Sequence, residues 1–378
     1  MSVNYIGMAL VLNCGSSSIK YQVVDTTQDA PLATGLIERV TDFAAAIHRI
    51  IAELNAPESG VDIERLTVVG HRVVQGGAEF VAPTIIDDEV ERHIALLTPL
   101  APLHTPPNLA GITAARAAFP HLPHVAVFDT AFHATMPRAA YAYAIDRNIA
   151  EEHGIRKYGF HGTSHSYVSR EVARAMGREP RELNVISLHL GNGASACAIR
   201  AGRSIDTSMG LTPLQGLVMG TRSGDIDPAV VMHLVRTTGM SIDDVDALLN
   251  RQSGMLGLAG SNDMRDVQAA ADAGNEAASL ALEIYCRRVR GYVGQYFAHL
   301  GSVDAIVFTA GVGENSDVVR LQSLAGLGGL GIVMDAERNI GPKKIPTLVS
   351  AEESAVQVWV VPTNEEREIA LQSIAAVS

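Results

Sequence analysis

The stretch Leu10-Val11-Leu12-Asn13-Cys14-Gly15-Ser16-Ser17-Ser18-Ile19-Lys20, continued by Tyr21-Gln22-Val23-Val24, predicts two β-strands joined by a tight turn. The turn carries three serine hydroxyls and an asparagine amide, and a lysine follows it closely. Such groups, together with backbone N–H groups, can hold phosphate oxygens, and Lys20 adds a positive charge. An ordinary, purely structural turn can have the same serine-rich composition. Other motifs must therefore decide whether this turn binds phosphate.

The composition is typical of a globular protein. The chain has 378 residues, 47% of them apolar, which suits two domains with sizeable cores. Its net charge of −12 argues against nucleic acid or an anionic membrane surface as a partner. Three cysteines, no basic residue before Lys20 and no long apolar run predict a cytoplasmic protein without disulfides, signal peptide or membrane span.

Apolar patterning predicts that strands and helices alternate along the chain. A second strand–turn–strand unit, residues 184–199, repeats the opening motif, which predicts a duplicated architecture with nucleotide phosphates held between the halves. A break in the pattern at residues 130–147 suggests the crossing between domains. Further strands are expected at 31–37, 66–74, 124–128, 304–309 and 355–361, and helices at 42–54, 87–97, 107–119, 227–237, 242–250, 263–273, 275–299 and from 362 onward.

Four glycine-bearing turns follow apolar strands. They span residues 13–18, 191–193, 220–224 and 311–313. Glycine at such positions lets backbone N–H groups approach an anion closely. The Walker A pattern is absent, and the last turn lacks the third glycine of the dinucleotide fingerprint. The turns therefore favour phosphate binding of another kind over a P-loop or Rossmann domain.

Two arginines occupy unusual positions. Arg72 lies within the apolar run Val68–Val74, where an unpaired charge is costly, so it must meet an anion. That anion is either a substrate or the carboxylate of a structural ion pair. Arg222 lies on a loop among Gly, Ser and Asp residues, where it suits a phosphate clamp, and a solvated surface arginine is the alternative.

Histidines and carboxylates add further candidates. His161 is surrounded by glycines and small hydroxyl residues, which favours a site role over core packing, whereas His104 is ambiguous. Asp129 follows a strand, a position that suits a cleft-facing carboxylate as well as a helix cap. Glu365 opens the last helix, where a carboxylate also stabilises the helix dipole.

Taken together, the chain resembles the acetate kinase family over nearly its whole length. The segments that carry the resemblance are LNCGSSSIK, HRVVQGG, PLHTPPN, FDTAFH, YGFHGTSH, HLGNGAS, GLTPLQGLVMGTRSGDIDP, DMR at 263–265, TAGVGENS and PTNEE. The resemblance implies an α/β fold of two duplicated actin-like (ribonuclease H-like) domains with a nucleotide cleft between them. This is the fold of sugar kinases, actin and the heat-shock chaperone ATPase domain. The expected domains are residues 1–130 joined by the helix 366–378, and residues 131–365.

The resemblance also implies a reaction, the reversible transfer of the ATP γ-phosphoryl group to acetate with Mg²⁺ or Mn²⁺, by a homodimer. Arg72, Asp129, His161 and Arg222 would be catalytic, with His161 and Arg222 stabilising the transition state and His104 supporting the site. Asn13 and Glu365 would hold the metal ion. The substrate's methyl group would contact Val74, Leu103, Phe160 and Pro213 beside Arg72. ATP or ADP would contact Ser16, Ser18, Lys20, His189, Leu190, Gly191, Asn192, Gly193, Asp263, Met264, Arg265, Gly311, Val312, Gly313, Glu314 and Asn315.

The chain departs from the family pattern at a few positions. Gln75 and Gln215 stand where His and Glu are expected, and Cys14 stands where Ala is common. Gln75 adjoins the expected acyl pocket, so a propionate or butyrate kinase is the alternative function. Arg72 and Val74, two apart on one expected strand, would share a face and make Val74 a wall of that pocket.

Overall fold

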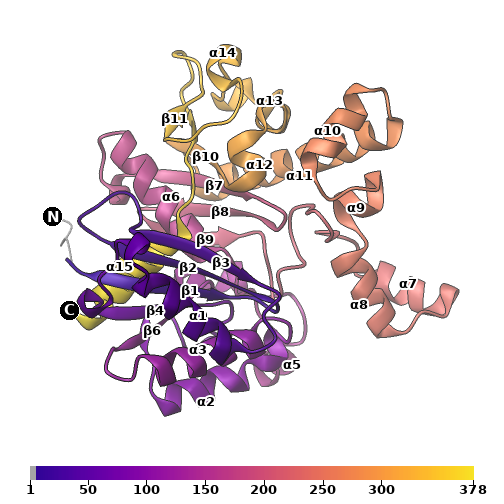
Figure 1. Cartoon of the computed structure of the whole chain (residues 1–378). Coiled ribbons are helices and arrows are strands. Elements are labelled where there is room, and N and C mark those ends of the chain that lie inside the picture. The colour runs from indigo at the N-terminus through magenta and orange to yellow at the C-terminus, as the bar shows by residue number, and fades with distance from the viewer. Residues whose placement is uncertain (1–5) are drawn as a thin grey trace. The chain divides into compact units, whose positions relative to one another are not determined.

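The computed structural model describes residues 6–378 and divides the chain into two compact units, each built on a six-stranded sheet (Figure 1). Unit 1 contains the chain up to Ala134, residues Phe160–Tyr167 and residues Asn364–Ser378. Unit 2 contains Thr135–Gly159 and Val168–Thr363. The expected boundaries at 130/131 and 365/366 lie within a few residues of this division, but the return of Phe160–Tyr167 to unit 1 was not foreseen.

The sheet of unit 1 has the order β3-β2-β1-β4-β6-β5. The hairpin β1–β2 and strand β3 are antiparallel, β1, β4 and β6 are parallel, and β5 is an antiparallel edge. The strands are β1 (Met8–Cys14), β2 (Ser18–Asp25), β3 (Ala33–Glu38), β4 (Val68–Val73), β5 (Thr84–Ile85) and β6 (His124–Phe128).

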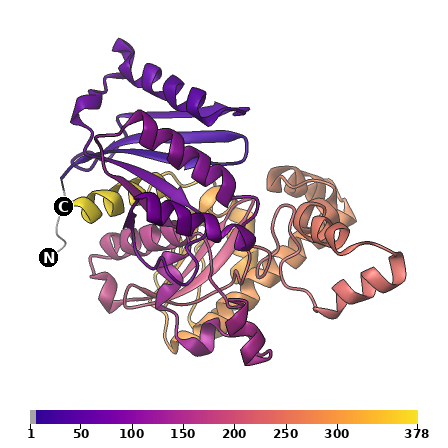
Figure 2. The same ribbon diagram turned by 90° about the horizontal axis from the view of Figure 1, so that it is seen from below.

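Helices cover both faces of this sheet because its central strands are apolar on both sides. On one face, Leu10 and Leu12 of β1 pack with α1 and α3, and on the other Ala9 and Val11 pack with Ile369 of α15. The turned view shows α15 running beside these strands (Figure 2). The helices of unit 1 are α1 (Phe43–Asn55), α2 (Asp88–Leu96), α3 (Thr105–Ala118) and α15 (Glu365–Val377).

The sheet of unit 2 has the order β11-β12-β10-β7-β8-β9. Here β7, β8 and β9 form an antiparallel meander, β7, β10 and β12 are parallel, and β11 is an antiparallel edge. The strands are β7 (Asn184–Leu190), β8 (Ala194–Arg200), β9 (Arg203–Thr207), β10 (Ala305–Thr309), β11 (Thr347–Leu348) and β12 (Gln357–Val360).

The long helix α11 packs on β7 and β8 of this sheet and also contacts α9, α10 and α13. The helices of unit 2 are α4 (Arg138–Tyr141), α5 (Arg147–Glu152), α7 (Ala229–Thr238), α8 (Ile242–Arg251), α9 (Gly254–Ala259), α10 (Met264–Asp272), α11 (Glu276–Leu300), α12 (Ala310–Asn315), α13 (Asp317–Leu324) and α14 (Ala336–Asn339). Helix α6 (Gly162–Ala175) begins in unit 1 and continues in unit 2.

The two sheets have the same topology. Each begins with a three-stranded antiparallel meander, continues with two parallel strands, and ends with a two-residue edge strand that precedes the last parallel strand in the chain. In each opening hairpin the first glycine of the turn donates its N–H to a backbone carbonyl ahead of it, Gly15 N to Ser18 O (2.8 Å) in unit 1 and Gly191 N to Gly193 O (3.0 Å) in unit 2, and the second turn is one residue shorter in this bond. The expected duplication of an actin-like α/β architecture is therefore confirmed.

Most expected elements are present with ends shifted by a few residues. Asp42 rather than Thr41 caps α1, accepting from the backbone N–H of Ala45. The prediction of a turn at 311–313 is wrong, because these residues lie in the short helix α12. The expected loop at 130–147 contains α4. In the described part of the chain, no helix is long and apolar enough to span a membrane.

Candidate functional site

A bidentate ion pair between Arg72 and Asp129 lies at the centre of the site in unit 1. Arg72 Nε and Nη2 donate to Asp129 Oδ1 and Oδ2 at 3.0 and 2.7 Å. The two residues are brought together because β4 and β6 are parallel neighbours, with Arg72 in register with Val127 and Asp129 directly after β6. The side chain of Asp129 is 1% exposed, whereas that of Arg72 is 22% exposed. The guanidinium therefore has a buried carboxylate on one side and solvent access on another.

Two further predicted residues contact Arg72. Arg72 Nη1 donates to Asn13 Oδ1 at 3.3 Å, and Arg72 Nε lies 4.0 Å from Glu365 Oε2. Asn13 comes from the end of β1 and Glu365 from the first turn of α15. Glu365 also accepts a hydrogen bond from Thr163 Oγ1 at 3.2 Å. The structure thus brings four of the predicted site residues together, from four separate segments of the chain.

The charges of this cluster shift the pKa values of its members. Burial acts to lower the pKa of Arg72, but the carboxylates of Asp129 and Glu365 outweigh burial and raise it, so the guanidinium stays charged. Burial raises the pKa of Asp129, while Arg72 opposes that rise. A Coulombic interaction with His104 also acts to lower the pKa of Asp129, which puts His104 within electrostatic range of the pair.

Gly162 places His161 beside Asp129. The backbone N–H of Gly162 donates to Asp129 O at 2.8 Å, and a Cβ at this glycine would overlap that same oxygen. His161 itself has a left-handed backbone, with φ of 56°, which a non-glycine residue adopts only under constraint. His161 directly precedes α6, and its carbonyl accepts from His165 N at 3.0 Å. The chain therefore holds this histidine in a strained, defined position.

Lys20 faces a carboxylate that the sequence analysis did not assign. Lys20 Nζ lies 2.7 Å from Glu366 Oε1, and the lysine side chain is 47% exposed whereas that of the glutamate is 8% exposed. In the preceding turn Ser16 is exposed and Ser18 is half-buried. The hairpin thus presents an accessible ammonium and hydroxyl groups at the end of the sheet where β4 and β6 also end.

The expected acyl pocket is only partly assembled in unit 1. Phe160 and Val74 are buried, but Leu103 is 56% exposed. The prediction that Val74 shares a strand face with Arg72 is wrong in its premise, because β4 ends at Val73 and Val74 is held by its N–H donating to Asn108 Oδ1 at 3.1 Å. The departure Gln75 is buried next to it, with Oε1 accepting from Gly77 N.

In unit 2, Arg222 is a half-buried guanidinium without a carboxylate. Its Nη1 donates to Pro213 O at 3.1 Å and contacts Met219 Sδ at 3.6 Å, and no described residue forms an ion pair with it. Burial lowers its pKa, and no acidic neighbour opposes that shift. Arg222 is therefore half-buried rather than fully solvated, and no described carboxylate neutralises its charge.

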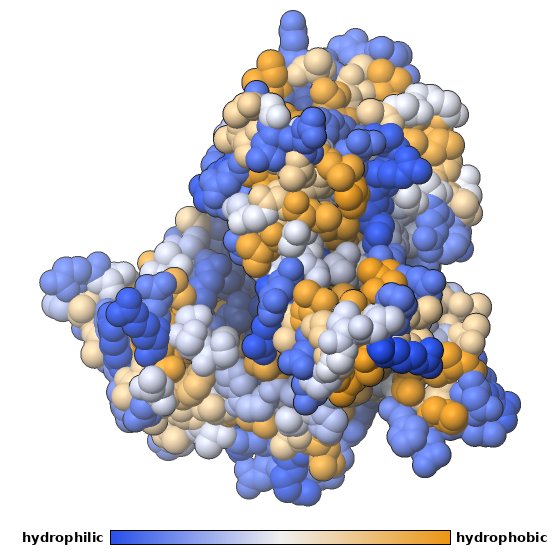
Figure 3. Space-filling model, turned by 90° about the vertical axis from the view of Figure 1, so that its right-hand side faces the viewer, coloured by the Kyte–Doolittle hydropathy of each residue, from blue (hydrophilic) through white to orange (hydrophobic). Residues whose placement is uncertain are grey.

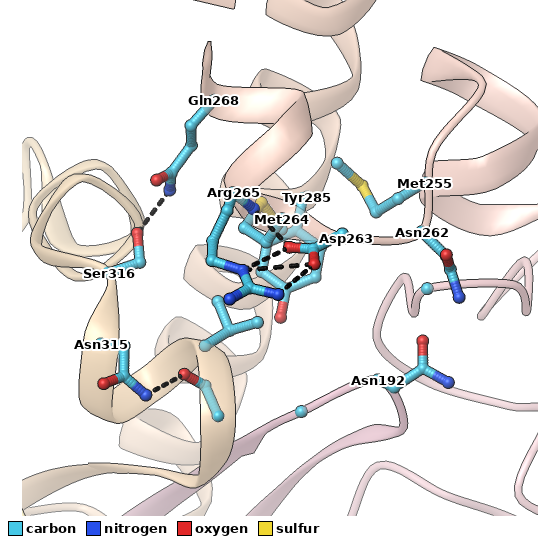
Figure 4. A pocket seen from close by; sticks show the side chains of 14 residues that line it. Asn192, Met255, Asn262, Asp263, Met264, Arg265, Gln268, Tyr285, Asn315 and Ser316 are labelled. Atoms are coloured by element: carbon cyan, nitrogen blue, oxygen red, sulfur yellow. Dashed lines mark hydrogen bonds and ion pairs between the residues drawn. The ribbon is translucent and has the colours of Figure 1, made fainter. Parts of the chain in front are cut away.

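A cavity of about 630 Å³ in unit 2 contains many of the residues predicted to bind nucleotide (Figure 4). Gln268 Nε2 donates to Ser316 Oγ across it, and Asp263 accepts from Arg265, which lowers the pKa of Asp263 to about 2. Its volume is that of a typical small-molecule site. It is lined by Gly191, Asn192, Gly220, Met255, Asn262, Asp263, Met264, Arg265, Gln268, Tyr285, Gly311, Val312, Asn315 and Ser316.

Eight predicted nucleotide contacts do not line this cavity: Ser16, Ser18 and Lys20, which belong to unit 1, and His189, Leu190, Gly193, Gly313 and Glu314 of unit 2. Leu190 is a fully buried core residue of β7. Glu314 instead accepts from the N–H groups of Ala310 and Thr363 at 2.8 and 3.0 Å. These contacts hold the first turn of α12, where Ala310 has a left-handed φ of 64°. Glu314 therefore supports the cavity wall without facing the cavity.

Several residues around the two sites were missed by sequence reasoning. Thr163 and Glu366 lie inside motifs that were quoted, so their hydroxyl and carboxylate groups were available as signals. Met255, Asn262 and Gln268 carry no pattern that separates them from ordinary helix and loop residues. Tyr285 is hidden within the long apolar repeat of α11.

Comparisons with known proteins agree with this geometry. The family model described as the acetokinase family matches residues 8–42 and 39–371. A protein from Streptomyces avermitilis named acetate kinase is 54% identical over 392 residues, covering 97% of each chain. The crystal structure of Porphyromonas gingivalis acetate kinase superposes with a TM-score of 0.94 at 39% identity, covering 98% of this chain and 100% of that one.

A crystal structure of a propionate kinase from Francisella tularensis is nearly as similar, with a TM-score of 0.91 at 39% identity, covering 97% of this chain and 99% of that one. These similarities extend over the whole described fold, and they include the segments that hold Arg72, Asp129 and the cavity of unit 2. The chain belongs to the acetokinase family.

Proposed function

We propose that this protein is an acetate kinase, which transfers the γ-phosphoryl group of ATP to acetate and forms acetyl phosphate and ADP, reversibly. The observation that carries this proposal is Arg222, a half-buried guanidinium that no described carboxylate neutralises. A charge in that setting is stabilised best by an anion brought by the substrates. The 54% identity to an acetate kinase over nearly the full chain supports the same conclusion.

The residues of unit 1 are suited to bind the carboxylate acceptor. Arg72 is oriented by its bidentate pair with Asp129 and keeps solvent access for a second anion. A carboxylate nucleophile is ionised near neutral pH, so the reaction needs no strong general base. What it needs is relief of the repulsion between two anions, and Arg72, Arg222, Lys20 and His161 are the groups that would provide it. His161 and Arg222 would stabilise the charge that spreads over the equatorial phosphoryl oxygens.

The cavity of unit 2 is suited to bind ATP or ADP. Gly191, Gly220 and Gly311 line it with backbone, and a Cβ at Gly311 would meet no atom within 4 Å. The absence of a side chain there leaves room for a ligand, as close approach of phosphates to backbone N–H groups requires.

Asn13 and Glu365 fit a magnesium site. They offer an amide oxygen and a carboxylate, the hard oxygen ligands that Mg²⁺ prefers, and both lie next to Arg72. In kinase sites the protein supplies one or two such ligands and the substrate phosphates supply others. The ion would neutralise phosphate charge, and Mn²⁺ could take its place. Thr163, which donates to Glu365, would orient that carboxylate.

Propionate kinase is the second candidate function. The similarity to the Francisella propionate kinase equals that to the Porphyromonas acetate kinase in identity, so the solved structures do not separate the two activities. The residues expected around the acyl group are Val74, Leu103, Phe160 and Pro213. We propose acetate over propionate, and propionate over butyrate, because Val74 is buried and one methylene is discriminated by only about 1–3 kcal/mol.

We also propose that the protein is a homodimer that associates through α7. None of the residues of this helix is buried, and Val230, Met232 and Val235 are 39%, 44% and 37% exposed. Apolar side chains reach the surface, among polar ones, on the side of the molecule shown in Figure 3. A contiguous patch of exposed apolar groups marks a contact surface, and we propose that these side chains of α7 form part of one. Sedimentation should give a dimer for the wild type and a monomer for Met232→Glu.

The three cysteines are free and buried, which suits a protein of the reducing cytoplasm.

The activity is tested by incubating the protein with ATP, Mg²⁺, acetate and hydroxylamine, which should yield an acyl hydroxamate. Arg222→Ala should lower kcat by about 10²-fold or more, the effect of losing one transition-state donor. Its urea midpoint should stay near that of the wild type, because Arg222 holds only a loop carbonyl and a thioether. Arg203→Ala, at an exposed position of β9, is the matched control and should keep full activity. No hydroxamate with acetate, propionate or butyrate would refute the proposal.

A further inference from the structure

Helix α11 contains two buried tyrosines whose hydroxyl groups lack a partner in the described structure, Tyr285 and Tyr296. Their side chains are 2% and 0% exposed. The third inward tyrosine of the helix, Tyr292, donates to Asp225 Oδ2 at 2.7 Å. Because buried hydroxyls are nearly always hydrogen-bonded, an unpartnered one indicates a missing ligand, a trapped water or a tolerated cost.

Only Tyr285 belongs to the cavity of unit 2. It lines the cavity together with Met264 and Asp263 at the start of α10, and Figure 4 shows it beside these residues, with its hydroxyl oxygen buried at the cavity wall. Tyr296 lies elsewhere along α11, against Tyr292 and His299. Both residues therefore lie on α11, are buried and have an unpartnered hydroxyl, but only Tyr285 lies at a cavity that a ligand can enter.

The cavity that Tyr285 lines is suited to a flat, mostly apolar ring with polar edges. Met255 and Met264 contribute thioethers, and the side-chain amides of Asn262 and Gln268 contribute hydrogen-bonding groups. Glycine backbone at Gly191, Gly220 and Gly311 lines other parts of the same cavity. Phosphates suit the glycine backbone, so the base of a nucleotide suits the part lined by tyrosine and methionine.

We propose that the hydroxyl of Tyr285 hydrogen-bonds the purine base of ATP and ADP and so contributes to base selection, an inference that rests on the proposed kinase function. The hydroxyl oxygen is fully buried in the empty protein, so binding must move a covering side chain. Met264 lines the same cavity, and its unbranched, flexible side chain is suited to such a movement. The base then supplies the partner that the phenol lacks.

The test compares Tyr285→Phe with its matched control Tyr296→Phe. ADP binding is measured by titration calorimetry, and the unfolding temperature is measured without nucleotide. Tyr285→Phe should bind ADP about 10-fold more weakly, the effect of one hydrogen bond. Tyr296→Phe should bind ADP as the wild type does. Both variants should unfold at or above the wild-type temperature, because each removes an unpartnered buried hydroxyl.

Two further ligands locate the contact. The loss in Tyr285→Phe should persist with 2′-deoxyadenosine diphosphate, which lacks a ribose hydroxyl, and should vanish with inorganic tripolyphosphate, which lacks the base. Unchanged ADP affinity in Tyr285→Phe would overturn the inference while leaving the kinase function intact, and so would a loss that disappears with the deoxynucleotide. A wild-type protein that binds no ADP would overturn the proposed function and this inference with it.

Discussion

Replacing Asp129 by Asn should separate the structural role of the Arg72–Asp129 pair from its role in activity. Asn keeps the shape of the side chain but removes the charge that neutralises Arg72. Removing one partner of a buried ion pair costs about 3–5 kcal/mol. Since Arg72 keeps 22% exposure and its contact with Asn13, the loss in the free energy of unfolding should fall at the low end, about 3 kcal/mol.

The complementary variant Arg72→Met leaves Asp129, 1% exposed, without its cation, and should cost about 4–5 kcal/mol. The double variant contains no unpaired charge at this pair. It should therefore be more stable than the sum of the single losses by about 2–3 kcal/mol, a coupling typical of residues in direct contact. Urea unfolding of the wild type and the three variants, followed by tryptophan fluorescence and circular dichroism, gives these values.

Activity should follow a different pattern. If Arg72 grips the carboxylate acceptor, kcat should fall by about 10²-fold or more in both Arg72→Met and the double variant, although the latter regains stability. Stabilities that simply add, with a coupling below about 0.5 kcal/mol, would refute the direct pair. An Arg72→Met enzyme that is less stable but fully active would show that the pair is structural only.

Three further outcomes are expected. Gly162→Ala should lose most activity and lower the unfolding midpoint, because its Cβ overlaps Asp129 O and must displace His161, whereas Gly291→Ala, with open space around it, should keep full kcat. Val74→Ala should raise kcat/KM for propionate relative to acetate, and an unchanged ratio would exclude Val74 as the wall of the acyl pocket. Burial and His124 hold the pKa of His71 well below its usual range, so the unfolded chain takes up the proton first on acidification. The free energy of unfolding should therefore fall as pH drops from 7.5 to 5.5, by up to about 1.4 kcal/mol for this histidine, and His71→Phe should show a flatter profile.

Most strands were predicted correctly because the sequence features that mark a strand lie within the strand and its flanking turns. Apolar runs bounded by glycine and small polar residues located β1, β2, β4, β6, β7, β8, β10 and β12. The two-residue strands β5 and β11 were missed because an edge of that length has no periodicity to detect. Helix α6 was missed because its first turn, Gly162-Thr163-Ser164-His165, is polar and rich in small residues yet buried.

The candidate site in unit 1 was predicted largely from charged residues at positions where the sequence pattern calls for apolar ones. Arg72 within an apolar strand required an anion, and the structure shows that Asp129 provides one. The two interpretations of Arg72, a structural ion pair and a group that binds a substrate anion, are compatible, because the ion pair with Asp129 orients the arginine without burying it fully. The cavity of unit 2 was foreseen less completely. Its glycine turns were recognisable, but residues such as Tyr285 and Gln268 are placed there only by the packing of α10 and α11.

The shared topology of the two sheets has a consequence for how the halves tolerate sequence drift. In unit 1 the strand ends present particular side chains, such as Arg72, Asp129 and Glu365, so variation at these positions is limited by charge. In unit 2 the corresponding region presents backbone at Gly191 and Gly311, so variation is limited by the size of a Cβ rather than by charge. A saturation library should therefore divide along the duplication. When the library is selected for activity, Arg72, Asp129 and Glu365 should be intolerant of changes in charge, and Gly191 and Gly311 should be intolerant of side chains.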